Sequence, residues 1–202
     1  EAPGSLRVGA SKTIGEYVVA PKVGKFLQNH PEAGFSLLVD NTEVLLRLLE
    51  EGKLDFVLVE GFFDRERYDA QLFRQEAFFG VCAPGHRLAG RKVPLGEILE
   101  ERLLLREEGS GTRAIFEEAL HRQNYTLQSF PRVATVSDFA TIKSLVSEGL
   151  GISFLYAPAV EKEISVGTLA KFELEDAPMS GAFYFVCLKD NLFRRLWEEW
   201  LQ

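Results

Sequence analysis

The sequence has no apolar run long enough to cross a membrane and no charged-then-apolar leader. Its three histidines, His30, His86 and His121, lie far apart in the sequence, which does not favour a metal site. The two cysteines, Cys82 and Cys187, lie within strand-like runs and lack CxxC spacing, which predicts buried free thiols. We therefore expect a cytoplasmic protein without membrane contact, a metal ion or a disulfide.

Motifs of the common enzyme classes are missing as well. There is no P-loop lysine pattern and no G-x-G-x-x-G after the first predicted strand. Gly109-Ser110-Gly111 is not the G-x-S-x-G turn of a serine hydrolase, and no Ser-His-Asp set can be ordered. We expect no catalytic residues, no enzymatic activity and no cofactor. A net charge of −7 also makes this chain a poor candidate for gripping nucleic-acid phosphates by itself.

Hydrophobic residues make up 46% of the 202 residues, which is enough to form the core of one large or two small domains. Strand-like runs over residues 5–10, 35–39 and 55–60 alternate with helix-like runs over 14–28 and 44–49. The run at 35–39 alternates poorly, so burial on both faces is expected there. This order predicts a right-handed parallel sheet covered by helices.

A second α/β unit is predicted after an extended run over residues 70–83, which could span roughly 45 Å. Its expected strands cover residues 103–105, 132–136 and 150–155, and its helices begin near Ser110 and Ser137-Asp138. An apolar strand over 181–188 and a helix from Asn191 follow. That helix needs a sheet to cover, and the first unit is the natural one.

The first domain is therefore expected to be discontinuous. We place subdomain I at residues 1–76 plus 179–202 and subdomain II at residues 77–178. Two crossings between two α/β units predict a hinged pair with a ligand cleft between them.

Hydroxyl side chains and glycines gather where predicted strands meet helices. Ser110, Gly111 and Thr112 follow one buried strand, and the loop's amides with the helix dipole suit a small anion. Ser11 and Thr13 hold the same place after the first strand. The alternative for each hydroxyl is simple capping of a helix without a ligand.

Several ordered segments resemble the effector-binding domain of LysR-type transcriptional regulators. They cover nearly the whole chain and are Val8 to Ser11, Ala20-Pro21, Phe26, His30-Pro31, Asn41, Glu51 to Asp55, Cys82 to Ala89, Arg106 to Arg113 and Val146 to Phe154. The resemblance implies two Rossmann-like subdomains joined by two crossover strands, as in type II periplasmic binding proteins. It also implies a small effector in the cleft and an N-terminal winged helix-turn-helix, absent from this chain, that binds promoter DNA.

For partners and site, the resemblance implies a homodimer or homotetramer formed through helices 14–28 and 112–123. Carried over position by position, the family's ligand contacts fall on Ser11, Thr13, Glu60 or Gly61, Ser110, Gly111, Thr112, Ser137 and Phe139. Hydroxyl and N–H groups there suit a carboxylate, sulfate or phosphate. Glu60 would repel such an anion unless the ligand also offers an amine or a hydroxyl, and the alternative for Phe139 is core packing.

Two other classes share this architecture. A solute-binding protein of a transport system has the same bilobal fold but needs an export signal and works as a monomer. An enzyme on this fold would need a nucleophile and base that the sequence does not offer.

Overall fold

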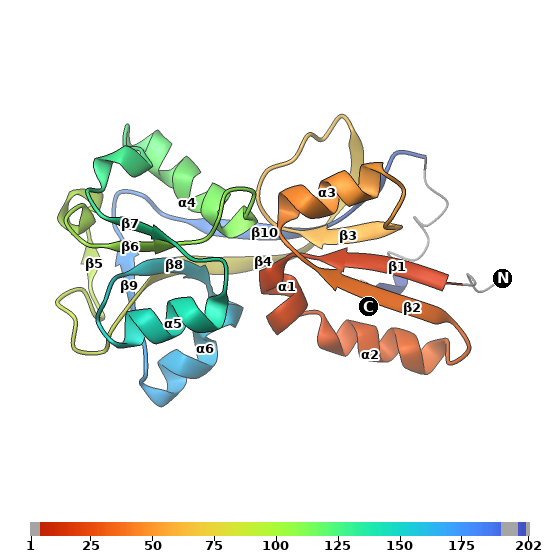
Figure 1. Cartoon of the computed structure of the whole chain (residues 1–202), viewed down its shortest axis with the longest axis horizontal. Coiled ribbons are helices and arrows are strands. Elements are labelled where there is room, and N and C mark those ends of the chain that lie inside the picture. The colour runs from red at the N-terminus through yellow and green to blue at the C-terminus, as the bar shows by residue number, and fades with distance from the viewer. Residues whose placement is uncertain (1–4, 191–197, 201–202) are drawn as a thin grey trace. The chain divides into compact units, whose positions relative to one another are not determined.

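The computed structural model describes residues 5–190 and 198–200. The chain forms two compact units, unit 1 (Glu1–Gln75 and Ala182–Gln202) and unit 2 (Glu76–Gly181). Strands β4 (Tyr68–Cys82) and β10 (Ser180–Leu188) carry the chain between them, and each has residues in both units (Figure 1). Within the described residues, no helix is long and apolar enough to span a membrane.

Unit 1 is built on three parallel strands, β1 (Ser5–Ala10), β2 (Gly34–Val39) and β3 (Phe56–Val59), in the order β2-β1-β3. Strand β10 pairs antiparallel with β3, and β4 follows β10 in the sheet. Helices α1 (Lys12–Tyr17) and α2 (Ala20–Asn29) follow β1, and α3 (Thr42–Glu50) follows β2. Parallel strands in this order place the carboxyl ends of β1, β2 and β3 at one edge.

The alternation of side chains along these strands gives unit 1 two core layers. One layer packs under α3 and contains Leu45, Leu49, Leu54, Val57, Val59, Tyr68 and Val186. The other lies on the side of α2, where the Trp200 ring is 6.0 Å from that of Phe26 and 5.4 Å from that of Phe56. The helix expected from Asn191 falls largely outside the described residues, but Trp200 itself packs in unit 1, buried at 2% exposure.

Two expectations for unit 1 need correction. Strand β2 is not buried on both faces, because it is the edge strand, pairs only with β1 and leaves Leu38 40% exposed. The helix expected over 14–28 is two helices, α1 and α2. The break falls before Pro21, which occupies the first turn of α2, where its missing N–H does not interrupt a helical hydrogen bond.

Unit 2 combines an antiparallel and a parallel part. Strand β4 pairs antiparallel with β8 (Ser153–Tyr156) and β9 (Ala170–Leu174), and β9 pairs with the short β5 (Lys92–Val93). Strands β6 (Leu103–Leu105) and β7 (Val133–Thr135) pair in parallel. The helices are α4 (Gly111–Arg122), α5 (Phe139–Ser147) and α6 (Ala157–Val166), with short 3-10 turns at Leu95–Ile98 and Leu127–Ser129.

The strand expected over 150–155 was placed too early. Leu150 is 44% exposed, and Ile152 makes only an isolated bridge to Leu103 before β8 begins at Ser153. Helix α6 was not predicted at all, although proline in its first turn and Gly167 at its end, with φ 82°, are ordinary boundary signals. The sequence-based subdomain boundaries fall after residues 76 and 178, and in the structure the boundaries between the two units fall after Gln75 and Gly181.

Both cysteines are buried thiols that take no part in a disulfide among the described residues, which confirms that prediction. Cys82 lies at the end of β4. Burial, aided by the negative charge of Glu101, raises the pKa of the Cys82 thiol to about 11. A thiol with that pKa is protonated at neutral pH and is a poor nucleophile.

Candidate functional site

The start of α4 forms the centre of the candidate site in unit 2. Ser110 caps the helix, and its Oγ accepts a hydrogen bond from the Arg113 N–H at 3.3 Å. Gly109 has φ 89°, which glycine adopts without strain and which lets the loop turn into the helix. Ser110 and Thr112 are each only 3% exposed. A helix start with buried hydroxyls and the positive end of a 12-residue helix dipole suits an anion.

Arg106 adds a buried positive charge directly after β6. It is 3% exposed, and its Nε and Nη2 donate to the two carboxylate oxygens of Glu107 at 2.8 and 3.3 Å. Its guanidinium lies 4.7 Å from the centre of the Phe139 ring. Arg106 belongs to one of the segments that resemble the LysR-type family, but it was not predicted as a site residue. Its position immediately after a buried strand was the signal that could have identified it.

The start of α5 lies at the same edge as the start of α4. Strands β6 and β7 are parallel, with Leu105 opposite Thr135, and the contact between Arg106 and Phe139 joins the two loops that follow. Asp138, and not Ser137, caps α5, with Oδ2 accepting from the Thr141 N–H at 2.9 Å. Ser137 is exposed, so capping does not explain it.

Phe139 is 1% exposed and begins α5. Its ring packs in the core and lies against the guanidinium of Arg106. A buried ring under a guanidinium fixes where that charge lies, at a gain of about 1 kcal/mol. Phe139 therefore positions Arg106 at the strand edge.

In unit 1, Ser11, Thr13 and Glu60 lie at the carboxyl edge of β1 and β3. The register places Ala10 opposite Leu58, so the residues that follow these strands are neighbours. Ser11 Oγ caps α1 by accepting from the Ile14 N–H at 3.4 Å, and it donates to a carboxylate oxygen of Glu60. Glu60 is 2% exposed and Thr13 is fully buried.

The Glu60 segment is fixed from a second side. Thr42 Oγ1, at the start of α3, donates to the Glu60 carbonyl oxygen at 2.9 Å. Gly61 follows with φ 95° and turns the chain away. A buried carboxylate oriented by a hydroxyl attracts donors and repels anions. The edge of unit 1 thus differs in charge from that of unit 2, which brings Arg106 and the α4 start together.

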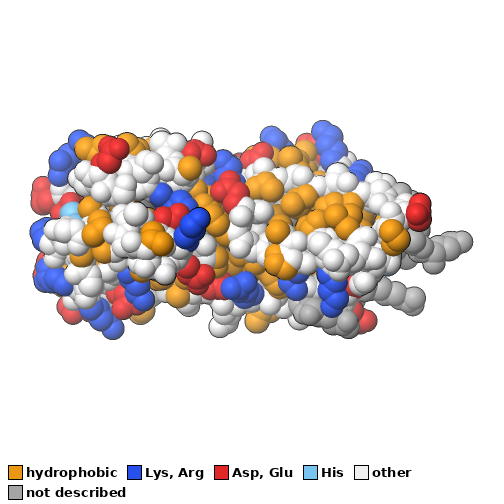
Figure 2. Space-filling model, turned by 90° about the horizontal axis from the view of Figure 1, so that it is seen from below, with side chains coloured by type: hydrophobic (Ala, Val, Ile, Leu, Met, Phe, Trp, Pro, Cys, Tyr) orange, Lys and Arg blue, Asp and Glu red, His pale blue; other side chains and the backbone are white. Residues whose placement is uncertain are grey.

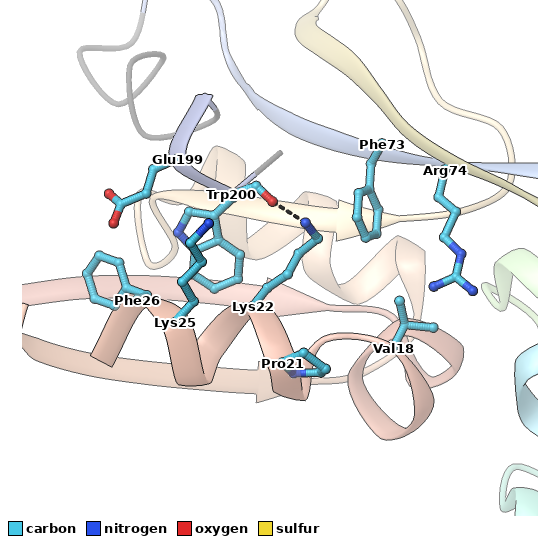
Figure 3. Close-up of a pocket in the computed structure, with 9 residues that line it drawn as sticks. All are labelled: Val18, Pro21, Lys22, Lys25, Phe26, Phe73, Arg74, Glu199 and Trp200. Atoms are coloured by element: carbon cyan, nitrogen blue, oxygen red, sulfur yellow. Dashed lines mark hydrogen bonds between the residues drawn. The ribbon is translucent and has the colours of Figure 1, made fainter. Parts of the chain in front are cut away.

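We also searched the part of the chain that the structure describes for metal sites and for further pockets. No group of three or more His, Cys, Asp or Glu residues there could hold a metal ion. A pocket of about 430 Å³ does exist in unit 1, beside α2 (Figure 3). None of the predicted ligand contacts lines this pocket, so it is a separate feature.

Comparison with known families gives a match over the whole chain. The model of the "LysR substrate binding domain" family matches residues 1–202. The RuBisCO operon transcriptional regulator of Allochromatium vinosum is 29% identical over 184 residues, which are 91% of this chain and 60% of the relative. The transcriptional regulator CysL of Bacillus subtilis is 28% identical over 178 residues, 85% of this chain and 58% of the relative. The chain thus spans about 60% of the length of such relatives.

Solved structures give the same fold. The Synechocystis PCC6803 CcmR regulatory domain in complex with 2-PG superposes with a TM-score of 0.85 at 23% identity, covering 98% of this chain and 96% of that one. The effector-binding domain of QuiR in complex with shikimate has a TM-score of 0.82 at 17% identity, covering 98% and 94%. These matches confirm the predicted α/β fold of the type II periplasmic-binding-protein kind.

Proposed function

The chain belongs to the LysR substrate binding domain family, and from this premise we propose that it is the ligand-sensing domain of a transcriptional regulator. Relatives of greater length that match it are named as transcriptional regulators. The acidic chain, with a net charge of −7, leaves promoter DNA to a separate part of the same protein. Such a regulator would act in the cytoplasm.

The ligand in this proposal is a small acid with a carboxylate, sulfate or phosphate group. The observation that carries it is the start of α4, where Ser110 and Thr112 are buried and follow closely in the chain after the buried Arg106, whose guanidinium pairs with Glu107. Charged hydrogen bonds at such a buried site are roughly twice as strong as neutral ones. The proposal assigns the anion to residues 110–112 and keeps Ser137 and Phe139 as neighbouring contacts.

The other end of the ligand is proposed to carry a hydroxyl or an amine. Glu60 in unit 1 is a buried carboxylate that accepts a hydrogen bond from Ser11, and a carboxylate at this edge attracts a donor and repels an anion. Ser11, Thr13 and Glu60 are therefore proposed to meet the donor end. Shikimate and 2-PG, which are bound in two neighbouring structures, are sensible first probes.

Assembly is proposed to use α2 and α4, within the ranges 14–28 and 112–123. Figure 2 shows the face that contains α2, where hydrophobic side chains gather over unit 1. Leu27 in α2 is 44% exposed, and a large exposed apolar side chain on a helix is a common element of an oligomer interface. We propose a homodimer or homotetramer, which light scattering on the purified chain can measure.

The competing reading is a solute-binding protein of a transport system. The names of the relatives favour the regulator, since those matched across about 60% of their length are transcriptional regulators. Two measurements separate the readings. A regulator domain should self-associate and should bind its acid without an accompanying transporter, whereas a strictly monomeric chain would favour the transport protein.

The experiment is a thermal-shift screen of the purified chain. The panel contains sulfate, phosphate, 2-PG, shikimate, dicarboxylic acids and amino acids. An acid present at 100 times its Kd adds about 2.7 kcal/mol to the free energy of unfolding, which raises the melting temperature by several degrees. A shift with one acid and its close analogues would support the proposal. Equal melting temperatures with every acid in the panel would count against an acid-sensing domain.

A further inference from the structure

The pocket beside α2 is lined by cations and aromatic rings from three separate segments of unit 1. Figure 3 shows Lys22 and Lys25 rising from α2, while Phe73 and Arg74 come from β4 on the opposite side. Trp200 lies beside Lys22 and Lys25, on the side away from Phe73 and Arg74, and its ring packs against Phe26. The volume of about 430 Å³ is within the range of small-molecule sites, about 300–1,000 Å³.

Positive charge dominates the polar groups of this pocket. Lys22 Nζ lies 4.9 Å from the centre of the Phe73 ring and donates to the backbone carbonyl of Trp200. Burial, followed by the nearby charges of Lys25 and Arg74, lowers the pKa of Lys22. Three like charges around one hollow repel each other, and an anion placed among them would relieve that repulsion.

The carboxylate of Glu199, which also lines the pocket, is already engaged. Both oxygens of Glu199 lie close to His30 Nε2, at 2.8 and 3.0 Å, and Asn29 donates to Oε1 at 3.4 Å. Glu199 therefore forms an ion pair or hydrogen bond with His30. Among the described residues that line the pocket, Lys22 and Lys25 therefore form no ion pair with a carboxylate.

The indole N–H of Trp200 provides an independent observation. The side chain is 2% exposed, and its Nε1 has no hydrogen-bond partner within residues 5–190 and 198–200. A buried N–H without an acceptor costs about 1–3 kcal/mol, so such groups usually have a bound partner. The indole is held by the rings of Phe35 and Phe56, at 6.2 and 5.4 Å, and lines the pocket.

We propose that this pocket is a second ligand site, which binds a small aromatic carboxylate. The carboxylate accepts hydrogen bonds from Lys22, Lys25 and the Trp200 indole. The aromatic body packs against Phe73 and Phe26, because a bare inorganic anion would leave the apolar lining and most of the volume unfilled. The site uses none of the residues assigned to the sensed acid, and it lies wholly in unit 1. A negative result for this site therefore leaves the proposed function standing, and a negative result for the proposed function leaves this site standing.

The test follows the tryptophan indole resonances of the ¹⁵N-labelled chain. The sequence has two tryptophans, so a Trp197→Phe variant assigns the Trp200 cross-peak. The probes are 3-phenylpropionate, its neutral amide and propionate, which separate the contributions of charge and ring. We expect the Trp200 cross-peak to move in a saturable way with 3-phenylpropionate, and the amide and propionate to bind at least about tenfold more weakly.

Variants that remove one positive charge test whether Lys22 and Lys25 bind the carboxylate. Lys22→Gln and Lys25→Gln should each weaken 3-phenylpropionate about tenfold. Lys53→Gln, a change of the same kind at an exposed lysine paired with Glu51, should leave the affinity unchanged, as should Ser110→Ala in unit 2. The proposal is overturned if the cross-peak does not move or if the amide binds equally well.

Discussion

Replacing Ser110 by alanine separates two roles of one hydroxyl. The first is capping, and its hydrogen bond from the Arg113 N–H is long, at 3.3 Å. The loss of stability should therefore fall at the low end of the range for helix caps, about 0.5–1 kcal/mol. The second role is the proposed hydrogen bond to an anionic ligand, which is worth about 1.5–3 kcal/mol, or a tenfold to 150-fold change in Kd.

Isothermal titration calorimetry with the acid found in the screen measures the second quantity, and urea unfolding measures the first. Thr126→Ala is the matched control. Thr126 caps the 3-10 turn at Leu127–Ser129 through a bond from the Gln128 N–H at 3.2 Å, in the same unit but with no proposed ligand contact. It should lower stability without changing Kd. Ser110→Thr keeps a hydroxyl and should retain most of the affinity.

The reasoning is refuted if Ser110→Ala binds the acid as tightly as the original chain while losing only stability. Ser110 would then be a helix cap and nothing more. An equal loss of affinity in the Thr126→Ala control would also refute it, because binding would then follow overall stability.

Three further predictions concern packing and titration. Lys143→Met should lower the free energy of unfolding by about 1–2 kcal/mol at pH 7, because it removes the 2.7 Å bond to Glu163. Burial alone would raise the pKa of Glu163, but the hydrogen bond and charge of Lys143 hold it below its ordinary value, so this difference should shrink as the pH falls below about 4 in urea titrations. Cys82, with its thiol pKa raised to about 11, should resist a thiol reagent at pH 7.5 until the chain is unfolded, and fast labelling of the native chain would disprove its burial. Gly80→Ala should lower stability by about 1–3 kcal/mol, because its Cβ would lie 2.2 Å from a phenylalanine ring of β9, whereas Gly85→Ala, with open space around it, should be nearly neutral on a melting curve.

The local signals of this chain carried most of the fold prediction. Helix starts were predicted near Ser110 and Ser137-Asp138 from hydroxyl and carboxylate side chains before apolar stripes, and Ser110 and Asp138 each accept a capping hydrogen bond there. The long run that became β4 was recognisable because no glycine or proline breaks it until Gly80. These features depend on residues within a few positions of each other, which is what a sequence shows directly.

Features that depend on distant neighbours were not predictable in the same way. The exposure of β2 follows from its edge position, which is set by which strands pair, not by its own four apolar side chains. The bond from Ser11 to Glu60 joins residues 49 positions apart and appears only once β1 and β3 are aligned. Arg106 was visible in the sequence, but its burial over Phe139 required the pairing of β6 with β7.

The central claim is the proposal that a small acid binds at the start of α4 in unit 2. The most direct test is backbone amide mapping by NMR while the acid from the screen is titrated into the ¹⁵N-labelled chain. The account predicts saturable shifts in residues 110–113 and also in residues 11–13, with the same Kd. Saturable binding that leaves both segments unmoved, or that moves only residues near Lys22 and Lys25, would contradict it.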